Sequence, residues 1–477
     1  MSMTKRALWS AIILGVLLCG AEESRACQDH DKFPGRRGPR PRRSDLGGRG
    51  PTDEASAASS TDVTYQCTAY SYAPLTAIQS SYPVQWKTAT IQLNDTEATS
   101  LFGSINATLN SKLPTDLPRG TPAGDFSGVS YSSTDPDCWW TSTLCTTPNA
   151  STGLPADITN VPEPMTWGLG FDDGPNCSHN ALYDYLQQEN LKATMFYIGS
   201  NIFDWPLQAL RAVSDGHQIC LHTWSHQYMT ALSNEEAFAE LYYTRKAVHD
   251  LLGVTPQCWR PPYGDVDNRI RTIAQALNLT TIIWSHDTDD WEANTNGVTP
   301  AMIDANYQGI IDMALNGSFN TFGPVVLNHE LDNYTMGEFM KYAPAIKSAF
   351  KWVVPIATAF NISQPYAESS VTFPTFSQVV SGTTATPNIA VNVSSQTPGQ
   401  GAGAAAAISA PAGSVTPSKA SVSSLPDTSS SAHASAGERR AAVSYSTAAS
   451  LALAMAVAMV VMALPLPLRE WSFERHL

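Results

Sequence analysis

Short apolar segments typical of buried β-strands recur along the middle of the chain. They lie at residues 166–171, 193–198, 217–221, 256–260, 281–285, 324–328 and 353–358. Amphipathic segments with helical spacing lie between most of them. Strands that alternate with helices usually pair in parallel, so the pattern predicts an α/β fold built on a mainly parallel sheet.

The clearest helix signal follows the third apolar segment. Ser233 and Glu236 have the spacing of a capping box, Phe238 and Leu241 lie on one helical face, and Gly253 ends the pattern. This segment is therefore predicted to be a connecting helix between two strands.

Polar residues that could carry chemistry come just after several predicted strands. In a (β/α) barrel the carboxyl ends of all strands meet on one face, where active sites lie. A doubly wound sheet would instead gather its site at one switch point. The spread of polar residues over many strand ends therefore predicts a distorted (β/α) barrel of about seven parallel strands.

The composition of the flanking regions sets the predicted boundaries. Residues 1–26 have a basic start, a short apolar run and small residues, which indicates a secretory signal peptide. Residues 27–61 are predicted to be a disordered, pro-like segment and residues 62–160 a loop-rich extension. We expect the catalytic domain at 161–362 and a flexible stalk rich in Ser, Thr, Pro and Ala at 363–440.

Residues 441–477 carry an uncharged apolar tail followed by a charged end. Small residues at 435–437, a polar spacer and the apolar tail favour a glycolipid-anchor signal. The charged end from Arg469 favours a single membrane span instead, which remains an alternative. With either, the catalytic domain is expected outside the membrane, at the cell surface or in the cell wall.

The net charge argues against one class of function, and the glycosylation sequons support secretion. The formal net charge of −14 argues against a general nucleic-acid binder. Asn-x-Ser/Thr sequons support a secreted, glycosylated chain. They begin at Asn94, Asn106, Asn149, Asn176, Asn278, Asn316, Asn333, Asn361 and Asn392.

Cysteines also suit a secreted protein. Cleavage after the basic cluster that ends at Arg43 would remove Cys27 and leave six cysteines, enough for three disulfides. We predict a Cys138–Cys145 pair. Cys220 and Cys258 could be paired or simply buried, and the remaining pairing stays open.

Two motifs indicate a metal site. Asp172 and Asp173 follow the first strand, and His222 and His226 follow the third. One carboxylate and two imidazoles form a three-ligand set that leaves a divalent metal an open position. The second carboxylate is then free to act as a base. Either motif alone would more often be an ordinary turn or a helix face, but together they favour the metal site.

Three further motifs follow in order. They are Arg260-Pro-Pro-Tyr263-Gly, Asp287-Thr-Asp-Asp290-Trp291 and Leu327-Asn-His329. With all five motifs the chain resembles the carbohydrate esterase family 4 polysaccharide deacetylases, which carry a NodB-type domain. Fungal chitin deacetylases are the members that it resembles most, and the resemblance covers about residues 160–360.

The resemblance implies a role for each motif. Asp172 would be the general base, and Asp173, His222 and His226 the ligands of a divalent metal, usually zinc and alternatively cobalt. Arg260 would orient the base, and the backbone N–H of Tyr263 would donate to the oxyanion.

The last two motifs would complete the site. Asp290 would hold His329, the general acid, whose pKa a neighbouring carboxylate raises. Trp291 and Leu327 would line the acetyl pocket. Asp287 remains either a supporting group or a solvated acid.

The expected reaction is hydrolysis of N-acetyl groups in chitin, or in another N-acetylglucosamine polymer, by a monomer. An O-acetyl esterase acting on xylan or another wall polysaccharide, and a non-catalytic glycan-binding protein of the cell wall, are the alternatives. The latter would be favoured by loss of a base or a ligand, which the sequence does not show.

Overall fold

The computed structural model describes residues 50–382, apart from 113–117 and 296. The predicted signal peptide, the basic cluster, most of the stalk and the apolar tail lie outside the described residues. Within the described ranges, none of the helices combines the length and apolar character that a membrane crossing needs.

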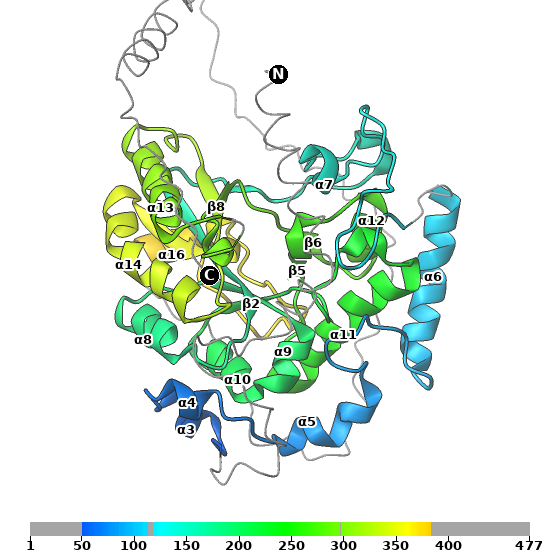
Figure 1. Ribbon diagram of the computed structural model, residues 1–477, viewed down its shortest axis with the longest axis horizontal. Coiled ribbons are helices and arrows are strands. Elements are labelled where there is room, and N and C mark those ends of the chain that lie inside the picture. Colours follow the sequence, from blue (N-terminus) through cyan, green and yellow to red (C-terminus); the bar gives the residue numbers. More distant parts are fainter. Residues whose placement is uncertain (1–49, 113–117, 296, 383–477) are drawn as a thin grey trace, which may run out of the picture. The chain divides into compact units, whose positions relative to one another are not determined.

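The strands form one curled, mostly parallel sheet (Figure 1). Its order is β1-β8-β2-β3-β4-β5-β6, with β9 paired to β2 and β7 paired to β8. Only the β1–β8 pair is antiparallel among the described strand pairs. The strands are β1 (Asn160–Val161), β2 (Thr166–Gly174), β3 (Thr194–Tyr197), β4 (Gln218–Leu221), β5 (Cys258–Trp259), β6 (Thr280–Thr281), β7 (His286–Asp287), β8 (Gly323–Leu327) and β9 (Trp352–Pro355).

Each predicted strand segment overlaps a strand, but segment 281–285 overlaps β6 only at Thr281 and ends just before β7. The backbone changes partner here: Ile282 N–H donates to Trp259 O in β5, and Ser285 N–H donates to Val325 O in β8. This stretch therefore joins the two sides of the sheet. The α/β fold and the distorted barrel are confirmed.

Helices follow the strands as the sequence pattern predicts. The capping box of Ser233 and Glu236 begins α11, and Gly253 ends it with φ +72°, a left-handed conformation that glycine adopts easily. The helices of this domain are α8 (Asn180–Gln188), α9 (Gly199–Asp204), α10 (Pro206–Ser214), α11 (Asn234–Leu252), α12 (Asn268–Ala276), α13 (Pro300–Leu315), α14 (Asn333–Ala349) and α15 (Ile356–Ala359).

The N-terminal extension begins earlier and is more regular than predicted. Ala57 is buried, and the Asn180 side chain donates to the carbonyls of Ala57 and Ser60. The disordered segment therefore cannot run to residue 61. The extension contains α3 (Glu54–Ala58), α4 (Val63–Gln66), α5 (Ala73–Ile78), the long helix α6 (Thr96–Lys112) and α7 (Trp140–Thr143).

The predicted start of the stalk at residue 363 is also wrong. Tyr366, Val371 and Phe373 are buried, and the Tyr366 hydroxyl accepts the backbone N–H of Ile219. A short helix, α16 (Phe376–Val380), follows. These apolar anchors hold a polar segment on the barrel, so the ordered chain continues past 362.

Three disulfides link the six cysteines of the described residues. The predicted Cys138–Cys145 bond is present, and Cys220 is paired with Cys258. The third, Cys67–Cys177, joins the extension to the segment that follows the two aspartates. The sequon at Asn176 is inaccessible to glycosylation in the folded chain, because the Asn176 side chain is buried and donates to Leu331 O.

Candidate active site

Strands β2 and β8 bring the two ends of the predicted site together. Beyond the regular ladder, Asp172 N–H donates to Asn328 O at 2.9 Å, and Glu330 N–H donates to Asp172 O at 3.0 Å. This bridge places Asp172 opposite His329. Two motifs that lie far apart in the sequence therefore meet at the carboxyl edge of the sheet.

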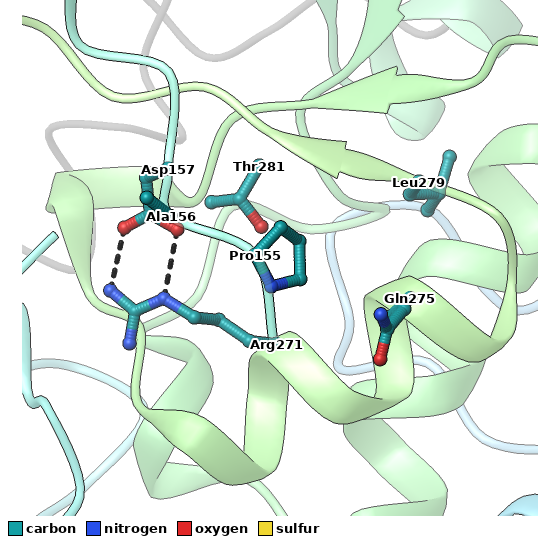
Figure 2. A pocket seen from close by; sticks show the side chains of 7 residues that line it. All are labelled: Pro155, Ala156, Asp157, Arg271, Gln275, Leu279 and Thr281. Atoms are coloured by element: carbon teal, nitrogen blue, oxygen red, sulfur yellow. Dashed lines mark hydrogen bonds and ion pairs between the residues drawn. The ribbon is translucent and has the colours of Figure 1, made fainter. Parts of the chain in front are cut away.

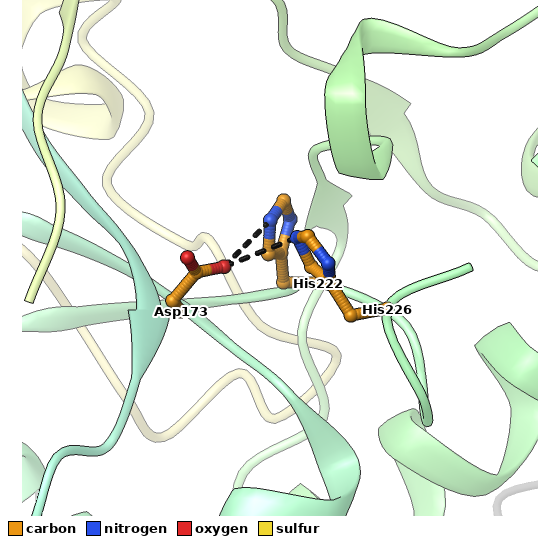
Figure 3. Close-up of side chains that lie close together, drawn as sticks. All are labelled: Asp173, His222 and His226. Atoms are coloured by element: carbon orange, nitrogen blue, oxygen red, sulfur yellow. Dashed lines mark ion pairs between the residues drawn. The ribbon is translucent and has the colours of Figure 1, made fainter. Parts of the chain in front are cut away.

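Asp173, His222 and His226 converge on one point (Figure 3). Oδ1 of Asp173 lies 3.4 Å from Nε2 of His222 and 3.2 Å from Nε2 of His226. One nitrogen or oxygen atom of each residue lies within 4.8 Å of the other two. Two imidazole nitrogens and one carboxylate oxygen are a donor set that suits zinc and leaves room for further ligands.

The hydrogen bonds behind these side chains prepare them for a cation. His222 Nδ1 lies 2.8 Å from the carbonyl oxygen of Arg260. A carbonyl can only accept, so Nδ1 carries the proton and Nε2 presents its lone pair. Oδ1 of Asp173 is buried and makes no hydrogen bond within the described part of the chain. These residues therefore fit a divalent metal.

Arg260 orients Asp172 beside this set, and Oδ2 of Asp172 lies 3.7 Å from Nε2 of His222. Nη1 of Arg260 donates to Oδ1 of Asp172 at 2.6 Å, and both side chains are buried. The guanidinium also lies over the ring of Phe196, 4.0 Å from its centroid. Burial lowers the pKa of Arg260 and the Asp172 carboxylate counters that shift. The pair leaves Asp172 an oriented carboxylate beside the metal set.

Asp290 holds His329 through hydrogen bonds to both of its carboxylate oxygens. The two oxygens of Asp290 contact Nδ1 of His329 at 2.6 Å and its backbone N–H at 3.0 Å. Burial opposes the charged imidazole, but Asp290, helped by Asp173 and Asp172, raises the pKa of His329 to about 9. His329 is therefore arranged to hold a proton at neutral pH.

The three residues predicted to contact the substrate lie at or just beyond the carboxyl ends of β5, β7 and β8. They are Tyr263, Trp291 and Leu327. Tyr263 follows two prolines, has φ +57°, and its ring stacks on Tyr228 with centroids 4.0 Å apart. Trp291 follows Asp290 and is 42% exposed, whereas Leu327 is buried at the end of β8. An exposed indole beside a buried cluster suits contact with a ligand.

Five residues at this edge of the sheet have a left-handed backbone without being glycine. Asp173, Thr223, His226, Tyr263 and Asp289 all have φ between +54° and +69°. Such conformations are costly for residues other than glycine and often accompany functional sites.

Asp287, whose role the sequence left open, is a partly buried member of the cluster. Its Oδ1 accepts the backbone N–H of Asp289. Burial raises the pKa of Asp287 to about 7. The residue is therefore not a fully solvated loop acid.

Sequence reasoning missed three buried carboxyl groups around the site. Glu240 lies in α11, Asp265 follows the Tyr263 turn, and Glu330 follows His329. Glu330 accepts the N–H of Asn176 and the hydroxyl of Tyr183. No local sequence signal marked Glu240, because its partners are mainly backbone N–H groups.

A separate small cavity lies between the extension and α12 (Figure 2). It has a volume of about 10 Å³, and the ion pair of Arg271 with Asp157 forms part of its lining. That space suits one water at most, so this cavity is not a substrate site.

Comparison with known proteins identifies the family. The polysaccharide deacetylase family model matches residues 159–282. Chitin deacetylase 2 of Cryptococcus neoformans var. grubii (strain H99) is 66% identical over 349 residues, which are 73% of this chain and 75% of that protein. This chain belongs to the polysaccharide deacetylase family.

One further relative and one solved structure are also similar to this chain. The chitin deacetylase of Amylomyces rouxii is 48% identical over 316 residues, 65% of this chain and 74% of that protein. The structure of the chitin deacetylase from the fungal pathogen Colletotrichum lindemuthianum covers 45% of this chain and 96% of its own, with 23% identity and a TM-score of 0.41. The resemblance predicted from the five motifs is confirmed: the chain is a deacetylase, and Asp173, His222 and His226 form a possible metal site.

Proposed function

We propose that this polysaccharide deacetylase hydrolyses the N-acetyl groups of chitin, giving chitosan and acetate. One observation carries the chemistry: a proton acceptor, Asp172 near the end of β2, and a proton donor, His329 just after β8, are bridged in parallel register beside the three-ligand set. The names of the relatives from C. neoformans and A. rouxii support chitin as the substrate.

Asp173, His222 and His226 would hold the metal, for which we propose zinc. Such an ion, when bound, polarises the acetyl carbonyl and lowers the pKa of a water molecule. The three ligands include no cysteine, and the Nε2 atoms of both histidines face the carboxylate. Cobalt, which also binds imidazole and carboxylate, is the alternative.

The remaining residues move protons and orient groups. Asp172, kept in place by Arg260, accepts the proton of the attacking water. The backbone N–H of Tyr263 donates to the oxygen that becomes negative. His329 gives its proton to the leaving nitrogen, so that water and amide become acetate and amine. Asp290 returns the imidazole to its protonated form by favouring the cation.

Two apolar side chains would shape the acetyl site. Leu327 is nearly fully buried at the end of β8, two residues before His329, and is suited to meet the acetyl methyl. Trp291 is exposed and is suited to form a wall against the sugar.

The proposed substrate is tested by acetate release from chitin oligomers and from acetylated xylan, with and without a chelator. We expect release from chitin oligomers that a chelator abolishes and zinc restores. Preferential release from xylan would assign an O-acetyl esterase. Glycan binding without acetate release from either polymer would assign a binding protein.

Replacing His329 with alanine should lower kcat on chitin oligomers by about 100-fold or more, the usual effect of removing a positioned acid. The loss should be smaller for an aryl acetate, because that leaving group departs without a proton. Steady-state kinetics on both substrates and metal content per chain are the measurements. Equal losses on the two substrates would show that His329 acts other than by protonating the leaving group.

A further inference from the structure

The loop that carries both histidines, residues 222–226, has a strained backbone. Thr223 has φ +64° and His226 has φ +56°, so two of its five residues are left-handed without being glycine. The loop's own bond, from His226 N–H to the Thr223 hydroxyl, measures 3.2 Å. This conformation persists only if surrounding groups fix it.

Glu240 provides this support by accepting hydrogen bonds from the loop. Its Oε2 accepts the backbone N–H groups of Trp224 at 2.7 Å and Ser225 at 2.8 Å. Its Oε1 accepts the Ser225 hydroxyl at 2.6 Å and the backbone N–H of Ala89 at 2.8 Å. Glu240 is fully buried, and these four donors compensate for burial of its carboxylate. Three of the four come from between the two histidines.

Ala89 belongs to the N-terminal extension, and the surrounding segment, residues 82–92, holds the same loop from a second side. The Trp224 indole donates to Val84 O at 3.2 Å, and the Tyr82 ring stacks on it with centroids 5.8 Å apart. Ser200 links the histidine loop to this segment, because its hydroxyl donates to Trp224 O and accepts Trp86 N–H.

We propose that Glu240 and the segment 82–92 are positioning elements of the metal centre, which hold the two imidazoles at the spacing that the cation requires. The inference rests on the metal site of the proposed function and adds to it a part of the chain outside residues 159–282, where the family model matches. Neither element touches the ligand atoms, so both act through the loop backbone.

The substitution Glu240→Gln tests this in the full-length protein. A glutamine amide offers one acceptor oxygen, so its NH₂ group must face a backbone N–H on one side and loses a bond there. We expect zinc affinity to fall about 10- to 100-fold, as for other groups that orient metal ligands. In the metal-free protein, hydrogen exchange should accelerate at the Trp224 and Ser225 amides and stay unchanged in β2 and β3.

Glu236→Gln is the matched control. It lies one turn earlier in α11 and caps the helix by accepting Ser233 N–H, which glutamine also does. Its zinc affinity and its exchange rates in the loop should equal those of the wild type. Ser200→Ala tests the link through Ser200, because it removes both the bond to Trp224 O and the bond from Trp86 N–H without altering Glu240, and zinc affinity should again fall.

The outcomes separate this inference from the proposed function. Wild-type protein that binds no zinc would overturn the metal site itself. Wild-type binding with equal affinity and equal loop exchange in Glu240→Gln would overturn only the positioning role. If Glu240→Gln does not fold, Ser225→Ala, which removes a single donor, should still lower affinity, and unchanged affinity there would reject the role. Unchanged affinity in Ser200→Ala would reject the part given to the link through Ser200.

Discussion

The substitution Asp172→Asn is expected to lower turnover by about 100- to 10,000-fold, the range for loss of a general base, while the protein keeps its metal. Asparagine can still accept the Arg260 bond of 2.6 Å, so the geometry should survive. It cannot accept the proton of the attacking water. Acetate release from chitin oligomers and metal per chain by elemental analysis are the two measurements.

Stability should change as well, because Arg260 would keep its charge in a buried site without an anionic partner. Removal of one member of a buried pair typically costs about 3–5 kcal/mol of unfolding free energy. Denaturant unfolding of the metal-free variant measures this loss. Loss of metal together with activity would instead make Asp172 a ligand and contradict its assignment as the base.

The second large effect is expected for His226→Ala, in which metal content and activity should fall together. His226 supplies one of three ligands, and its ring contacts the Asp173 carboxylate at 3.2 Å. With two ligands left, the site should hold far less than one metal ion per chain after dialysis. Activity should return in part when zinc is added in excess.

His249→Ala is a matched control for that substitution. His249 lies near the end of α11, where its imidazole contacts Asp250 and is half exposed. Its removal should leave metal content and activity unchanged. Full metal occupancy in His226→Ala would reject the three-ligand set.

The sequence predicts much of the fold because apolar segments and helix caps are local signals. Ser233, Glu236 and Gly253 mark α11 correctly. Segment 281–285 was less predictable, because its backbone changes pairing partner from β5 to β8. Both domain boundaries were misplaced because a few apolar residues, such as Ala57 and Phe373, anchor polar segments whose composition resembles disordered chain.

The site shows the same division between local and distant signals. Asp172, Asp173, His222 and His226 stand in short motifs whose residue types suggest their chemistry. Glu240 could not be assigned, because its partners are mainly backbone N–H groups that no sequence pattern displays. Hydrogen bonds to the backbone are specified by the fold and become visible only in the structure.

The support of the histidine loop by residues 82–92 has a consequence for how the protein folds. The Trp86–Ser200 and Ala89–Glu240 contacts join residues that are 114 and 151 positions apart in the chain. Contacts between such distant residues form slowly, because a long segment of chain must be closed first. We expect high zinc affinity to develop as a late step of refolding. A zinc-binding signal that lags behind the recovery of helical circular dichroism would show this order, and simultaneous recovery would contradict it.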